Sequence, residues 1–122
     1  MNAPLRPNRP TNIQYINIDA LCDEAESAGL AWSDAKAAYE LLDQTRKSVL
    51  AQGMKNYFAE GMTAAKAETM ALADLGYTEY LHKLVAAGHA ADRARVRFDI
   101  LKTRIELLRT NSATERAAMS LR

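Results

Sequence analysis

Two long heptad patterns constrain the fold of this chain more than any other feature. In each pattern, small and apolar residues recur at alternating steps of three and four, the period of a helix that packs along a narrow stripe of another helix. The first pattern comprises Leu21, Ala25, Ala28, Trp32, Ala35, Tyr39 and Leu42. The second comprises Tyr77, Tyr80, Leu84, Ala87, Ala91, Ala94, Phe98, Leu101, Ile105 and Leu108. The patterns predict one helix over about 19–57 and another over about 78–110.

Capping signals divide the remaining sequence. Thr63 is a good N-cap for a short alanine-rich helix, and Gly76 is expected to end that helix. Thr78 would then cap the long helix that follows. Ser112 and Glu115 have the Ser-x-x-Glu spacing of a capping box, which indicates a separate short helix over the last ten residues or so.

The predicted fold is all-α: a long, antiparallel, coiled-coil-like helical hairpin with a short helix in the connection. Two long helices joined by about 20 residues fold back on each other. Pairing large with small side chains gives a register in which the numbers of facing residues add up to about 133. Tyr39 would then face Ala94, and Phe98 would face Ala35. We assign residues 18–122 to this single domain and residues 1–17, which hold all three prolines, to a flexible arm.

Several apolar residues fall outside both heptad patterns. A hairpin alone would leave them in water, and an exposed apolar stripe in a soluble protein usually marks an interface. The candidates are Leu30, Leu41, Val85, Val96, Ile100 and Leu107. We expect Met70, Leu72 and Leu75 of the short helix to cover some of them. Self-association into a dimer or higher oligomer, an oligomeric helical bundle, is expected to bury the rest.

The amino-acid composition limits the partners and the cellular location that can be expected for this chain. Sixteen basic and fifteen acidic residues nearly cancel, so attraction to nucleic acid has to come from local clusters of charge. Cys22 is the only cysteine, which fits a reducing compartment. No apolar run has the roughly 18 residues of a membrane span. We therefore expect a cytoplasmic protein that has no membrane partner.

Basic residues on the second long helix are the main candidates for a nucleic-acid site. Arg95, Lys102, Arg109 and Arg116 recur every seven residues and flank the heptad stripe. Arg46 and Lys47 lie where the first pattern breaks. Such residues contact phosphates in nucleic-acid-binding proteins. The alternative is that Lys102, Arg104 and Arg109 form ion pairs with acidic residues of the first helix, namely Asp23, Glu24, Glu26 and Asp34.

Motifs of catalysis are missing from the sequence. It contains no nucleophile elbow, phosphate loop, Cys-x-x-Cys or His-Glu-x-x-His. Glu79, His82, His89 and Asp92 share one helix face, but a di-iron bundle needs such motifs on two helices. We expect no enzyme activity, no catalytic residue, no metal and no cofactor.

Three segments resemble a group of small phage and prophage proteins. The resemblance covers about residues 20–120. The matching positions are Leu42, Asp43, Arg46 and Lys47, then Ala65, Lys66, Glu68, Tyr80 and Leu84, then Arg109, Ala113, Thr114, Arg116 and Ala117. Members of the group are often encoded near recombination and single-strand annealing genes, so the resemblance implies a role in phage DNA metabolism by association.

Two functions follow as hypotheses. The first is a non-enzymatic accessory protein of phage DNA recombination or replication that binds single-stranded DNA or a DNA-bound protein. The alternative is a protein–protein interaction module that inhibits a host nuclease or defence factor and does not bind DNA. The shared pair Arg46 and Lys47 has two interpretations as well: a buried polar contact that fixes the helix register, or part of a binding surface.

Overall fold

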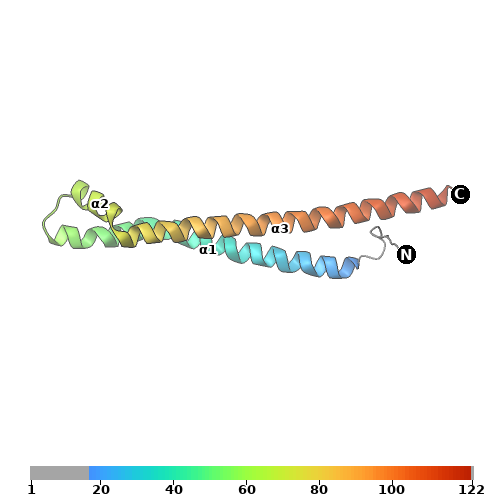
Figure 1. Ribbon diagram of the computed structural model, residues 1–122, viewed down its shortest axis with the longest axis horizontal. Helices are drawn as coiled ribbons and strands as arrows, with labels where there is room; N and C mark the ends of the chain where they lie inside the picture. Colours follow the sequence, from blue (N-terminus) through green and yellow to red (C-terminus); the bar gives the residue numbers. More distant parts are fainter. Residues whose placement is uncertain (1–16, 122) are drawn as a thin grey trace, which may run out of the picture. The chain divides into compact units, whose positions relative to one another are not determined.

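The protein is all-helical in the part of the chain that the structure describes, residues 17–121 of a computed structural model. It has three helices, α1 (Ile18–Ala59), α2 (Ala64–Ala73) and α3 (Leu75–Ser120), and no strand within those residues (Figure 1). The predicted arm, apart from Asn17, lies outside the described residues. The described residues form two compact units, 17–30 with 95–121 (the first unit) and 31–94 (the second unit). The assignment of 18–122 to a single domain stays a prediction.

The ends of α1 and the start of α2 follow the local sequence. Asn17 caps α1, since its Oδ1 accepts a hydrogen bond from the N–H of Ala20 at 3.2 Å. Thr63 caps α2 as predicted, and its Oγ1 accepts from the N–H of Lys66 at 3.4 Å. Between the two helices, Gly61 adopts a φ of 90°, a conformation that glycine reaches without steric cost.

Both predicted boundaries of α3 are wrong. Asp74 alone separates α2 from α3, so Gly76 lies inside the first turn of α3 and Thr78 is no cap. The N–H and the hydroxyl of Thr78 both donate to the carbonyl oxygen of Asp74 instead. At the other end, α3 continues through Ser112 to Ser120 without a break. The alanine-rich sequence after Ser112 favours helix, and a capping box acts only where a helix begins.

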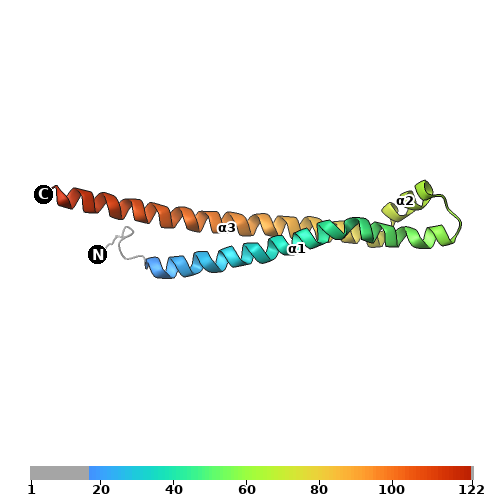
Figure 2. The same ribbon diagram turned by 180° about the vertical axis from the view of Figure 1, so that it is seen from behind.

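In the second unit, α2 packs through its alanines. Two views of the ribbon from opposite sides both show α2 beside the end of α1 and the start of α3 (Figures 1 and 2). Ala67 and Ala71 are 0% and 1% exposed, and the Cβ of Ala71 lies 3.5 Å from the place where a Cβ on Gly53 of α1 would be. Small residues on both helices therefore bring the two backbones close together.

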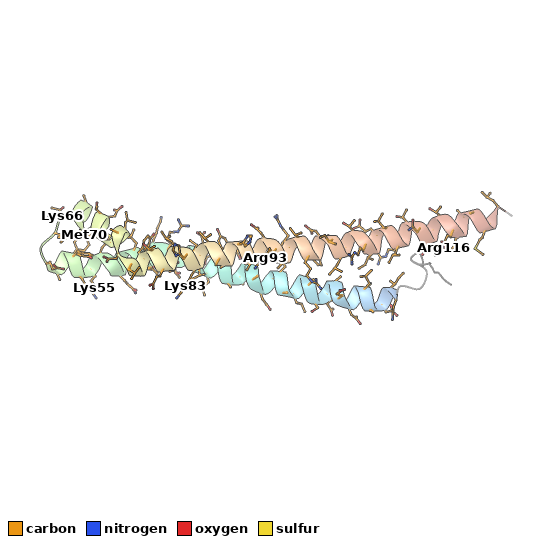
Figure 3. The ribbon with its side chains drawn as sticks, in the orientation of Figure 1. Lys55, Lys66, Met70, Lys83, Arg93 and Arg116 are labelled. Carbon is orange, nitrogen blue, oxygen red and sulfur yellow. The ribbon has the colours of Figure 1, made fainter. Side chains whose placement is uncertain are left out.

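The larger apolar residues of this segment do not act as predicted. Met70, Leu72 and Leu75 are themselves exposed, and Figure 3 labels Met70 on α2. They do not cover the apolar residues of the long helices, because α2 turns its alanine side inward.

Tyrosine hydroxyls hold the second unit together where the first heptad pattern breaks. Tyr80 of α3 donates a hydrogen bond to the carbonyl oxygen of Leu42 in α1. Its hydroxyl also lies 3.1 Å from Oγ1 of Thr45. Thr45 is half-buried and takes the inward position three residues after Leu42, so the contact between α1 and α3 continues with a polar layer.

The first unit has a small apolar core between the start of α1 and the second half of α3. Ala25, Ala28 and Leu101 are buried in it. Leu21, Phe98 and Ile105 are partly buried and pack against them. These residues all belong to the two heptad patterns, so the faces that the helices bury in this unit are the predicted ones.

The register of the two long helices differs from the predicted one. A Cβ on Gly29 would lie 3.1 Å from Cε1 of Phe98, and a Cβ on Gly88 would lie 3.1 Å from Cε1 of Tyr39. In both units the numbers of these contacting residues add up to 127. The predicted sum was about 133, so the helices are offset by nearly one heptad. A shift of one heptad keeps the same faces buried and changes only the partners, which is why the patterns alone did not reveal it.

The close approach of aromatic rings to Gly29 and Gly88 gives a test of the register. Gly53→Ala meets only an ordinary contact, so better helix propensity should raise the free energy of unfolding by up to about 1 kcal/mol. In Gly29→Ala and Gly88→Ala the new methyl group meets a ring at 3.1 Å, which should cancel that gain. Urea unfolding followed by circular dichroism measures all three. Equal stabilisation by the three substitutions would contradict the observed register.

The hydroxyl of Tyr57 gives a second test. It donates to Oδ1 of Asp74 at 2.6 Å. That hydrogen bond, then burial, then the negative charges of Asp74 and Glu60 raise the pKa of Tyr57 above its ordinary value of 10.0. The bond therefore stabilises the fold fully below pH 10 or so, and this stability is lost as pH rises through the raised folded-state pKa. Absorbance titration, with Tyr57→Phe subtracted, should show the tyrosine titrating at lower pH in Asp74→Asn than in the natural chain. Identical titrations would show that the bond does not form.

Candidate nucleic-acid interface

The four basic candidates on α3 lie along one side of the helix and are all exposed. Arg95, Lys102, Arg109 and Arg116 follow one another every seven residues. A helix rises about 1.5 Å per residue, so neighbours are about 10 Å apart along the axis. The direction drifts by roughly 20° per heptad, so the four form a strip that winds slowly around α3.

Arg109 and Arg116 lie beyond the packed part of the first unit. Leu108 is the last buried residue of α3, and among the described residues after it only Ser112 is partly buried. Figure 3 labels Arg116 on the part of α3 that continues past the described start of α1. No ion pair within residues 17–121 involves either arginine. Both guanidinium groups therefore stand in water with their donors available.

Lys102 has a structural role as well. Its Nζ lies 5.4 Å from the centroid of the Phe98 ring, the distance of a cation–π contact. Phe98 is the ring that packs against Gly29. The aliphatic part of Lys102 therefore lies beside the apolar core, while its charge remains at the surface.

The ion pairs predicted between the acidic residues of α1 and Lys102, Arg104 or Arg109 do not form within residues 17–121. Glu24 pairs with Arg97, with 3.5 Å between Oε2 and Nη2, and both side chains are largely exposed. Such exposed pairs contribute about 0–1 kcal/mol. Asp23 and Glu26 of the same unit form no ion pair with any described residue. Pairing with the acidic residues near the start of α1 thus does not neutralise Arg109.

Arg46 and Lys47 lie on the surface of the second unit. Nη2 of Arg46 is 2.8 Å from Oδ1 of Asp43, one turn earlier on α1, and both side chains are 46% exposed. The interpretation as a buried polar contact is therefore wrong for Arg46. Its neighbour Thr45 makes the inward contact instead, because Thr45 lies three residues after Leu42 and so faces the same side of α1.

The six predicted interface residues are all exposed. The exposed fractions of Leu30, Leu41, Val85, Val96, Ile100 and Leu107 lie between 50% and 70%. In the first unit, Leu30 lies on the outer side of α1, two residues after the buried Ala28. Ile100 lies two residues after Phe98, on the outer side of α3. These two apolar surfaces are on different helices and do not form one patch.

Sequence reasoning missed several residues that the structure brings into use. Thr45, Gly29 and Gly88 all serve the contact between the long helices. A glycine one position beside a heptad pattern, as at Gly29 and Gly88, is a sequence signal for the close approach of a ring from the other helix. Asp99 was missed as well; together with Arg104 it lines a shallow depression on the outer side of α3.

The remaining surface offers little chemistry. A cleft of about 560 Å³ in the second unit is lined by Val49, Leu50, Gln52, Gly53, Ala71, Asp74, Leu75, Gly76 and Tyr77. Asp74 is its one ionisable carboxylate, and it already accepts the hydrogen bond from Tyr57. Within residues 17–121 there is no group of three or more metal-ligating side chains. In the same residues no helix combines the length and the apolar character needed to cross a bilayer.

Comparisons with protein-family models, with curated proteins and with solved structures produced no match to this chain. The resemblance to phage proteins therefore stays a prediction.

The different settings of Arg46 and Tyr80 predict different mutational costs. Arg46→Ala removes an exposed pair one turn apart and should cost no more than about 0.5 kcal/mol. Tyr80→Phe leaves the part-buried carbonyl of Leu42 without this donor and should cost about 1 kcal/mol. Urea unfolding of both variants gives the comparison. A larger loss for Arg46→Ala would mean that Arg46, not Tyr80, links the two helices.

Proposed function

We propose that the chain is a non-enzymatic accessory protein of phage DNA recombination or replication that binds single-stranded DNA or a DNA-bound protein. The observation that carries the proposal is the exposure of Arg109 and Arg116 on one side of α3 without an ion pair in the described residues. Arg95 and Lys102 extend the same strip toward the core of the first unit. Arg46 and Lys47 are weaker candidates because they lie in the second unit and Arg46 already pairs with Asp43.

The chemistry of the strip suits a phosphate backbone better than base recognition. Guanidinium groups bind phosphate through fixed, paired N–H donors. Neighbouring candidates are about 10 Å apart along the axis, so each could contact a different phosphate of an extended strand. Phe98 is the one aromatic residue among residues 95–120, and its ring faces α1 and packs against Gly29, so it is not available to stack on a base. Binding should therefore be electrostatic, sensitive to salt and indifferent to sequence.

Self-association is part of the proposal. The exposed apolar residues on the outer side of α3 support a homo-oligomer, a dimer or higher. The same residues favour the second candidate function, a protein–protein interaction module that inhibits a host nuclease or defence factor without binding DNA. The two functions differ in whether Arg109 and Arg116 contact phosphate, and a binding assay separates them.

The test is a gel-shift titration of the full chain with single- and double-stranded oligonucleotides at several salt concentrations. Each phosphate contact with single-stranded DNA should contribute about 0.7 to the slope of log affinity against log salt. Arg109→Gln together with Arg116→Gln should lower the slope by about 1.4 and weaken binding at low salt by about tenfold or more.

Arg97→Gln is the matched control. It removes the same charge from the same helix, but Arg97 is the residue that pairs with Glu24. Its affinity for DNA should stay close to that of the natural chain. DNA binding that is absent, or equally weakened by both kinds of substitution, would contradict the assignment of phosphate contacts to Arg109 and Arg116 and favour the interaction module.

A further inference from the structure

The outer side of α3 carries a heptad pattern of its own. Val96, Ile100, Thr103 and Leu107 follow at steps of four, three and four, and all four are exposed. We call these four residues the outer stripe. It lies on the side of α3 away from Phe98, Leu101 and Ile105, the residues that face α1. The alternating spacing of four and three is typical of a helix that packs against another helix in a coiled coil, in addition to its contact with α1.

Charges of opposite sign border the outer stripe on its two edges. Asp99 and Glu106, seven residues apart, lie along one edge. Arg97 and Arg104, also seven residues apart, lie along the other. Asp99 and Arg104 line a shallow depression together with Val96, Ile100 and Thr103, so charges and apolar residues belong to one surface.

We propose that a second copy of this chain packs on the outer stripe, with the two α3 helices parallel and related by a two-fold axis along them. The proposal rests on the self-association included in the proposed function and adds its surface and orientation. In a parallel pair, the acidic edge of one helix lies along the basic edge of the other. Asp99 of one copy then lies next to Arg104 of the second copy, because each acidic position faces the position five residues later on the other helix. The two-fold axis repeats this ion pair, so the dimer contains it twice.

The charges select against the antiparallel alternative. In an antiparallel homodimer, each edge meets the same edge of the other copy. Arg97 and Arg104 would then face the same arginines, and Asp99 and Glu106 would face the same carboxylates. Like charges at those positions are destabilising, so the charge pattern specifies direction as well as partner.

Arg97 contributes less than Arg104 to this surface. Its guanidinium lies 3.5 Å from the carboxylate of Glu24 within the chain. Asp99 and Arg104 form no ion pair with any other residue of 17–121, so the contact between copies depends on them. The outer stripe is short and includes the polar Thr103. The dimer should therefore be of moderate affinity and respond strongly to a single change of charge.

Charge exchange tests the orientation. Sedimentation equilibrium of the full chain at micromolar concentration should show a dimer. Asp99→Arg and Arg104→Asp should each weaken dimerisation by about tenfold or more, because each places like charges together twice. The double variant restores opposite charges across the interface and should recover the dimer. Asp23→Arg, which changes net charge as much as Asp99→Arg but lies on α1, should leave it intact.

The outcomes of these experiments distinguish the parallel pairing of α3 from self-association in general. A natural chain that is monomeric at these concentrations overturns self-association, and the parallel pairing with it. A dimer that Asp99→Arg strengthens or leaves unchanged overturns the parallel pairing alone, since an antiparallel pair gains from that substitution. Circular dichroism of each variant shows that the helices are retained.

Disulfide trapping gives a second measurement that does not alter charge. In a Cys22→Ser background, Ile100→Cys places one thiol on the outer stripe. In a parallel two-fold pair the two cysteines face each other, and mild oxidation should convert the chain to a covalent dimer. Ser27→Cys, exposed on α1, is the matched control and should stay largely monomeric. Equal cross-linking of the two variants would overturn the proposal.

Discussion

The contact on which the rest of the structure depends is the fit of large side chains of one long helix against alanine and glycine of the other. In the first unit, Leu101 packs with Ala25 and Ala28, and the ring of Phe98 lies against Gly29. In the second unit, the ring of Tyr39 lies against Gly88. A helix pair with so narrow an interface buries few residues, so each close contact carries a large share of the stability.

That narrow interface also leaves most of the α3 surface available for the two proposed contacts. The contact with α1 occupies one side of α3 and leaves the remaining sides exposed to solvent. The strip of Arg109 and Arg116 and the outer stripe with Val96 and Ile100 lie on different sides of the same helix. A nucleic acid on one and a second copy of the chain on the other would not compete for the same residues, so the two proposed contacts are compatible.

Hydrogen bonds between polar groups connect the helices where the heptad pattern of apolar residues is interrupted. The first heptad pattern breaks after Leu42, and there Tyr80 donates to the Leu42 carbonyl while Thr45 faces inward. At the junction of α2 and α3, Tyr57 donates to the carboxylate of Asp74. The hydroxyl of each tyrosine donates a hydrogen bond to an oxygen on a different segment. These directional hydrogen bonds take the place of apolar packing at the two positions. Such contacts are sensitive to the loss of one donor in a way that the alanine layers are not.

The helices, the faces that they bury and the exposure of the apolar residues outside the heptad patterns could all be predicted from the sequence, because periodicity and helix propensity are local properties. The cap at Thr63 could be predicted as well, since it needs only its own first turn. The register, the pairing of Glu24 with Arg97 and the exposed position of Arg46 became known only from the folded structure. A heptad pattern looks the same after a shift of seven residues, so the choice depends on which rings fit against Gly29 and Gly88, a contact between residues far apart in the chain.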